Sequence, residues 1–118
     1  MFRKKILTLL LLVLPFIGFG QDMKVIWEDN YGREFSIRAL SGNFGYSMIP
    51  GDRISYNYDD TVSKIGNVYI SYNYDGTVSK IGDVYIRYNY DGTVSQVGGL
   101  RISYTYDGKV SSTSGRVR

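Results

Sequence analysis

The sequence predicts an all-β protein, an antiparallel β-meander of 16-residue hairpin repeats. The first observation is a segment of sixteen residues that occurs four times without insertions, over 49–64, 65–80, 81–96 and 97–112. The second is an apolar/polar alternation with a period of two inside each copy, which is typical of strands. The third is an Asp-Gly dipeptide in three of the four copies, which favours a tight hairpin turn. A short tandem period indicates one supersecondary unit placed beside copies of itself.

The first twenty residues have the pattern of a secretory signal peptide. A basic segment over 3–5 precedes an apolar stretch over 6–17, and small residues follow up to Gly20. Cleavage near Gly20/Gln21 would give a secreted or periplasmic protein. The apolar stretch is shorter than the roughly 20 residues that a transmembrane helix needs, which favours a cleaved leader over a membrane anchor. We therefore expect no membrane span after cleavage.

The basic net charge belongs to this leader. The chain has 14 Lys+Arg and 11 Asp+Glu, and three of the basic residues but none of the acidic ones lie before Gln21. The remaining chain is therefore balanced, which gives no electrostatic reason to expect a nucleic-acid partner. The absence of cysteine and histidine removes thiol chemistry, the usual zinc ligands and the commonest general base. We expect no metal, no cofactor and no enzymatic activity.

The second copy shows how one hairpin is expected to form. Residues 68–74 read as the outgoing strand and 77–81 as the return strand, joined by a two-residue type I′ loop, Asp75-Gly76. Gly82-Asp83 is expected to form a second two-residue loop, of type II′. The predicted turn-forming residues of the last three copies are Asp75, Gly76, Asp91, Gly92, Asp107 and Gly108. Calcium is not expected at these aspartates, since equivalent corners two strands apart are roughly 9.5 Å from each other.

Two-residue loops at both turns assign each side chain of the copy to one face of the sheet. The face expected to be buried carries Val68, Ile70, Tyr72, Tyr74 and Ile81. The face expected to meet solvent carries Tyr69, Ser71, Asn73, Val78 and Lys80. On this solvent face, Lys64 is expected to lie opposite Tyr69 and Lys80 opposite Tyr85, which would place each ammonium group over a ring.

The unequal strand lengths shift each copy by two residues relative to the copy before. Over eight strands the shift amounts to a shear of about eight, which is compatible with a small closed barrel. A coiled single sheet is the competing expectation. Residues 21–48 are expected to form atypical strands that cap the apolar end of the array, and 113–118 a flexible C-terminal tail. No helix is expected after the signal peptide.

One set of equivalent positions on the solvent face is a candidate binding stripe, formed by Arg53, Tyr69, Tyr85 and Arg101. Such a stripe would suit a polysaccharide or an envelope protein, and a solvated sheet face is the alternative interpretation. The segment Tyr74-Asp75-Gly76-Thr77-Val78-Ser79-Lys80-Ile81 resembles the YD repeats of large bacterial surface and toxin-shell proteins, although it lacks the two residues usually found between aspartate and glycine. The resemblance implies a hairpin array that serves as a wall or scaffold.

These observations predict an exported bacterial β-hairpin repeat protein with a non-catalytic binding or structural role. The first alternative is a carbohydrate- or cell-envelope-binding module that uses the candidate stripe. The second alternative is a secreted, amyloid-like fibre subunit, in which each copy would be an arch stacked in parallel on the next. The Asp-Gly turns favour hairpins over arches.

Overall fold

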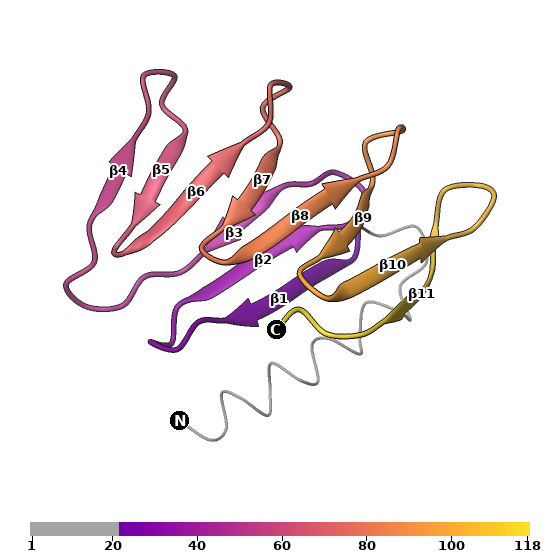
Figure 1. Cartoon of the computed structure of the whole chain (residues 1–118), viewed down its shortest axis with the longest axis horizontal. Helices are drawn as coiled ribbons and strands as arrows, with labels where there is room; N and C mark the ends of the chain where they lie inside the picture. The colour runs from indigo at the N-terminus through magenta and orange to yellow at the C-terminus, as the bar shows by residue number, and fades with distance from the viewer. Residues whose placement is uncertain (1–21) are drawn as a thin grey trace.

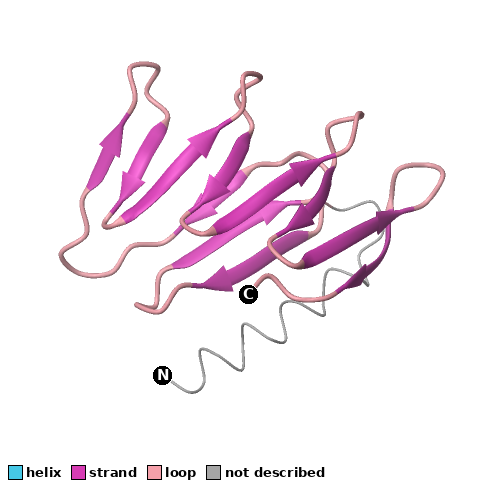
Figure 2. Ribbon diagram, viewed as in Figure 1, coloured by secondary structure: helices cyan, strands magenta, loops and turns pink. Residues whose placement is uncertain are grey.

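A computed structural model describes residues 22–118, so the predicted signal peptide over 1–20 lies outside the described residues. This part of the chain forms eleven β-strands and no helix (Figure 1). All pairings are antiparallel, and short loops join the strands (Figure 2). The prediction of an all-β meander is confirmed. Within 22–118, no helix has the length and apolar character needed to cross a membrane.

The strands form two sheets. The N-terminal sheet has the order β1-β2-β3, with β1 at Lys24–Glu28, β2 at Glu34–Arg38 and β3 at Phe44–Tyr46. The repeat sheet has eight strands in consecutive order, and each copy of the sequence repeat supplies one tip-forming hairpin. Its strands are β4 (Ile54–Tyr56), β5 (Val62–Ile65), β6 (Val68–Tyr72), β7 (Val78–Ile81), β8 (Val84–Tyr88), β9 (Val94–Val97), β10 (Leu100–Tyr104) and β11 (Val110–Ser114).

The two sheets form two layers. The described fold measures 42 × 39 × 21 Å, and its short dimension accommodates two sheets about 10 Å apart. One core joins both layers, with Phe35 and Ile37 from the N-terminal sheet and Ile65, Ile81 and Val97 from the repeat sheet all almost fully buried.

The repeat sheet remains open, so the closed-barrel alternative is wrong and the single-sheet alternative holds. The N-terminal strands lie across the apolar face of the repeat sheet (Figure 1), rather than over the end of the array as expected from the sequence. The N-terminal sheet covers the apolar face of the repeat sheet, so this face is buried without closure into a barrel. This accounts for an open repeat sheet despite the shift between copies.

The pairing between hairpins follows the sequence prediction. Ile81 pairs with Ile70 on one side and with Val84 on the other, so each copy is shifted by two residues. Gly82 has a φ of 61° and Asp83 does not have a positive φ. A positive φ at the first position alone is the signature of a type II′ loop, so the two-residue loop at Gly82-Asp83 is confirmed.

The turn at the tip of each hairpin is one residue longer than predicted. The amide of Gly76 donates to the Asn73 carbonyl at 3.0 Å, and the amide of Asn73 donates to the Thr77 carbonyl at 2.8 Å. The loop therefore contains Tyr74, Asp75 and Gly76, with Gly76 at a φ of 89°. This is a type I turn followed by a left-handed glycine, and the prediction of a two-residue type I′ loop at Asp75-Gly76 is wrong.

A β-bulge offsets the extra loop residue. Tyr72 pairs with Val78 and Ser71 pairs with Lys80, so Ser79 has no partner across the hairpin. The bulge moves the register by one residue, and Ile81 returns to its predicted partner Ile70. The other three hairpins shift register at the same place, so the bulged residues are Ser63, Ser79, Ser95 and Ser111.

The bulge exchanges the environments of two side chains. Between the tip and the bulge, Val78 lies on the same face as Tyr72 and is buried, and its equivalent Val94 is fully buried. Tyr74 lies in the loop and is fully exposed. The prediction that placed Tyr74 in the core and Val78 on the solvent face is therefore wrong, whereas Ile70 and Ile86 are buried as predicted.

The C-terminal residues, predicted to be a flexible tail over 113–118, pack against the repeat sheet. Thr113 and Ser114 are the last residues of β11, and the amide of Gly99 donates to the Val117 carbonyl at 3.2 Å. A Cβ atom on Gly98 would lie 2.1 Å from the Val117 carbonyl oxygen. The close approach of these two backbone segments thus requires glycine in the last turn between hairpins.

Candidate binding surfaces

The predicted stripe lies on the solvent face of the repeat sheet. Arg53, Tyr69, Tyr85 and Arg101 are all exposed, with 65% of Tyr69 and 57% of Tyr85 accessible. Arg53 immediately precedes β4, and the other three residues are the second residues of β6, β8 and β10. Equivalent positions in neighbouring hairpins place the four side chains in one row across the sheet.

The two tyrosines of this stripe already have partners within the protein. The Lys64 ammonium lies 4.9 Å from the centre of the Tyr69 ring, and that of Lys80 lies 4.8 Å from the centre of the Tyr85 ring. The cross-strand pairing that produces these contacts is the one predicted from the sequence. Each lysine is positioned to cover part of one ring face, which leaves less aromatic surface for a ligand.

A second set of tyrosines occupies the loops at the hairpin tips. We call it the tip row, and it consists of Tyr58, Tyr74, Tyr90 and Tyr106, each with a fully exposed side chain. The four loops lie along one edge of the repeat sheet (Figure 1). No Lys or Arg side chain of residues 22–118 is stacked over a tip-row ring. The tip row therefore presents more free aromatic surface than the stripe.

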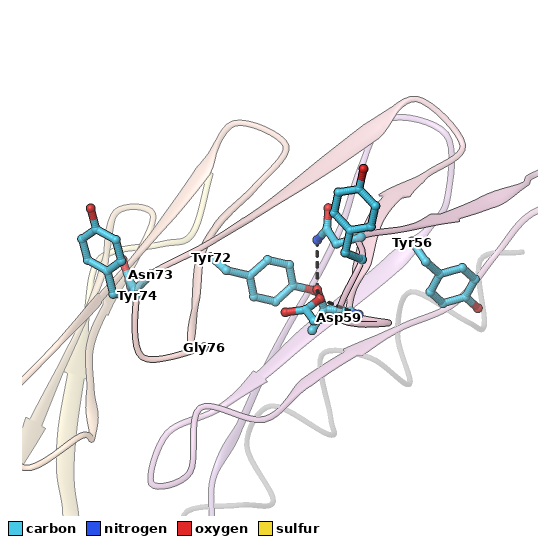
Figure 3. A pocket seen from close by; sticks show the side chains of 9 residues that line it. Tyr56, Asp59, Tyr72, Asn73, Tyr74 and Gly76 are labelled. Atoms are coloured by element: carbon cyan, nitrogen blue, oxygen red, sulfur yellow. Dashed lines mark hydrogen bonds between the residues drawn. The ribbon is translucent and has the colours of Figure 1, made fainter.

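A cleft separates the first two tips (Figure 3). Its volume is about 650 Å³, and residues of both loops line it, including Tyr58 and Asp59 from one and Asn73 and Tyr74 from the other. The Tyr72 side chain reaches across its base and donates from its hydroxyl to the Val62 carbonyl at 2.7 Å. Burial raises the pKa of the Tyr72 hydroxyl, so this group remains a donor at neutral pH.

The bridge formed by Tyr72 recurs between the later hairpins. Tyr88 donates to the Val78 carbonyl at 2.7 Å, and Tyr104 donates to the carbonyls of Val94 and Ala39. Neighbouring hairpins pair at only two positions next to their connecting loop, for example Lys80 with Tyr85 and Ile81 with Val84. The tyrosine hydroxyls thus connect the hairpins where the strand pairing has ended.

One aspartate in each tip loop accepts hydrogen bonds within its own turn. An Asp75 carboxylate oxygen accepts the Thr77 amide at 3.0 Å and the Thr77 hydroxyl at 2.7 Å, and the Asn73 side chain donates to the same hydroxyl at 2.9 Å. These bonds hold the pKa of the Asp75 carboxyl below its usual range. The Asp75 carboxylate therefore serves its own three-residue loop. No cluster suited to a metal ion is found in the described residues.

A buried ionic cluster surrounds Arg33, and no pattern in the sequence indicates it. The guanidinium group of Arg33 binds Asp52 through two nitrogens at 2.8 Å, Asp29 at 2.9 Å and the Asn67 side chain at 3.0 Å. Burial favours the neutral form of Asp29, but the hydrogen bonds from Arg33 outweigh it and lower the pKa of this carboxyl. The cluster joins the β1–β2 loop to the first repeat, and its polar atoms are satisfied, so its role is structural.

An apolar groove of about 380 Å³ runs between β1 and the C-terminal residues. The residues that line it include Val25, Trp27, Leu100 and Val117.

Comparisons with protein-family models, curated proteins and solved structures found no match to this chain. The candidate surfaces therefore rest on their own geometry.

Proposed function

We propose that this chain is an exported bacterial protein with a non-catalytic role, and that it binds a component of the cell envelope through the repeat sheet. The leader pattern supports export, and the resemblance to YD repeats suits a protein of the cell surface. The repeated hairpins supply a rigid, extended surface on which the same contact can be made several times.

The observation that carries this proposal is the exposure of tyrosine. Nine of the twelve tyrosines have large exposed side chains, and six of the nine belong to the stripe and the tip row. An exposed ring contributes little to stability through burial, and tyrosine is enriched at binding surfaces because its ring is apolar and its hydroxyl is polar. Binding therefore accounts for the distribution of tyrosine better than a purely structural role.

Co-sedimentation with isolated bacterial cell envelopes tests this proposal. We expect the protein to sediment with the envelopes in a saturable manner. A variant with serine at all six tyrosines of the stripe and the tip row should remain in the supernatant, and Tyr31→Ser should behave like the wild type because Tyr31 lies outside the repeat sheet. A wild-type protein that never sediments with the envelopes would contradict the proposal.

The fibre alternative makes a different prediction for the purified protein. Each copy in this structure is a hairpin whose two strands are antiparallel, whereas an amyloid arch would stack the copies in parallel. We therefore expect a monodisperse protein by light scattering and no thioflavin response. Fibres with a meridional reflection near 4.7 Å would favour the fibre alternative instead.

A further inference from the structure

We propose that the tip row is the ligand-binding site, and that its ligand is a neutral, linear polysaccharide that runs along the hairpin tips. This inference rests on the proposed binding function and adds to it the site and the class of ligand. It also replaces the stripe with the tip row as the main contact surface.

A comparison of the four copies with one another separates the two surfaces. The stripe position changes from Arg53 to Tyr69, Tyr85 and Arg101, whereas the tip position is tyrosine in every copy. The residue before it changes from Asn89 to Thr105 in the last copy, and the tip tyrosine is still present. A contact repeated along a polymer requires the same group at every step, and only the tip row provides it.

The fold gives no reason for tyrosine at these positions. In the third copy, the other residues that all copies share have structural places: Ile86 and Val94 are buried, Tyr88 donates to a carbonyl, Asp91 accepts hydrogen bonds in the turn, and Ser95 occupies the bulge. Tyr90 occupies the second position of a type I turn, which accepts most residues. Its ring is fully exposed, so neither packing nor the turn explains it.

The charge of the tips selects among possible ligands. Five aspartates lie in the four loops, Asp59, Asp60, Asp75, Asp91 and Asp107, and the nearby Lys109 is exposed. Hydrogen bonds from threonine lower the pKa of Asp75 and Asp91, so these carboxylates are ionised at neutral pH. An anionic polysaccharide, a nucleic acid or an anionic membrane would be repelled at this edge. Neutral sugars are not repelled, and their hydroxyl groups can donate to carboxylate oxygens.

The spacing of the tips suits a regular polymer. Equivalent loops are two strands apart, or roughly 9.5 Å for ideal strand spacing. Tyr58 and Tyr74 both line the cleft between the first two tips. The Tyr72 ring lies between the two loops (Figure 3). The face of a pyranose ring carries C–H groups with a partial positive charge, which are attracted to the negative face of an aromatic ring. One pyranose unit of an extended chain is shorter than this spacing, so successive tyrosines would meet alternate sugar units of one chain.

Affinity electrophoresis and calorimetry with soluble polysaccharides test the inference. The neutral linear probes are mixed-linkage β-glucan and hydroxyethyl cellulose, the anionic probe is alginate, and poly-lysine represents a basic peptide. The tip variant carries Tyr58→Ser, Tyr74→Ser, Tyr90→Ser and Tyr106→Ser. The stripe variant carries Tyr69→Ser and Tyr85→Ser, and Tyr31→Ser is the matched control for loss of one exposed tyrosine. Circular dichroism and urea denaturation establish that each variant is folded.

We expect the wild type to bind a neutral probe and not alginate. The tip variant should lose affinity by a factor on the order of 100, because linked contacts combine multiplicatively, and the stripe and control variants should bind normally. Loss of binding in the stripe variant alone would overturn the tip site but leave the proposed function standing. Preference for alginate or poly-lysine, or no binding to either neutral probe, would overturn the ligand class. A protein that binds envelopes but no neutral probe would contradict only the ligand class, whereas a protein that binds neither would contradict the proposed function as well.

Discussion

Tyr88 and Tyr90 lie two residues apart in one hairpin, and their hydroxyl groups have different environments. The Tyr88 hydroxyl donates to the Val78 carbonyl at 2.7 Å, whereas Tyr90 is fully exposed. We expect Tyr88→Phe to lower the free energy of unfolding by about 1 kcal/mol, because the Val78 carbonyl loses its donor in a partly buried site. Tyr90→Phe should leave it unchanged. Equal effects of the two substitutions in urea denaturation would contradict the bridging role of Tyr88.

Asp60 is the only described residue other than glycine with a positive φ, at 70°. It occupies the position of Gly76 in the next copy, and its amide makes the same turn hydrogen bond, to Asn57 at 3.0 Å. We expect Asp60→Gly to raise the free energy of unfolding by about 0.5 kcal/mol, because glycine adopts this conformation without steric strain. The reciprocal change Gly76→Asp should lower it. Chemical denaturation measures both, and a loss of stability in Asp60→Gly would show that the aspartate itself stabilises the first tip.

At the scale of the hairpin, the bulge decides which residues form the core. Strict alternation would place Tyr74 inside and Val78 outside, and the structure has the opposite arrangement. We expect Val78→Ala to destabilise the protein by about 2 kcal/mol through loss of buried methyl groups. Tyr74→Ala should change stability by no more than about 0.5 kcal/mol, as for other exposed positions. The reverse order of the two effects would show that the hairpin has the two-residue loop and no bulge.

The hairpin register could be predicted because two independent constraints agree. Gly82 fits the first position of a two-residue loop, and the apolar residues Ile81 and Val84 flank it on the same face. The tip could not be predicted in the same way, because Thr77 and Ser79 are small and polar and suit either face of the sheet. The extra loop residue and the bulge offset each other, so the pattern at Ile70 and Ile81 was compatible with both geometries.

The same ambiguity determines which of the candidate surfaces the sequence predicts. The exposed position of the stripe was predictable because Tyr69 and Lys64 lie next to the unambiguous loop between hairpins. The tip row is not predictable from the pattern, because strict alternation through Tyr74 to the end of the strand places this ring on the buried face. The Arg33 cluster was out of reach for another reason, since its partner Asp52 is 19 residues away and no local pattern connects them.

At the scale of the whole molecule, several carboxylates make stability depend on acid pH. The pKa is lowered in the folded state for Asp29, Asp52, Asp59, Asp75, Asp91 and Asp107. A lowered folded pKa gives stability that is present above the unfolded pKa of about 3.9 and is lost as the pH falls through the folded value. We therefore expect the urea midpoint to fall below pH 4 or so, after a plateau at neutral pH where no histidine titrates.

Two substitutions to asparagine separate this effect from a general response to acid. Asp52→Asn removes a carboxylate that binds Arg33 through both oxygens, so this variant should be less stable at pH 7 and lose less stability on acidification. Asp83→Asn is the matched control, because Asn67 occupies the equivalent turn position in the preceding copy and the ion pair of Asp83 with Arg118, at 3.3 Å, is exposed and contributes little to stability. It should follow the wild-type curve. An Asp52→Asn curve parallel to that of the wild type would exclude this carboxylate as a source of the acid sensitivity.

Tyrosine sets the alkaline limit of the same profile. Burial raises the pKa of Tyr104 to about 12, and its hydroxyl donates to the carbonyls of Val94 and Ala39, which joins the two sheets. The unfolded chain releases this proton near pH 10, so the contribution to stability is complete below pH 10 and is lost as the pH rises toward the folded value. We expect the urea midpoint to fall between pH 10 and 12, and to fall less in Tyr104→Phe, which has no hydroxyl to ionise.

Tyr106→Phe is the control, since its exposed hydroxyl has no such partner and its removal should leave the alkaline slope unchanged. Equal slopes in wild type and Tyr104→Phe would show that the hydroxyl between the two sheets does not determine this limit.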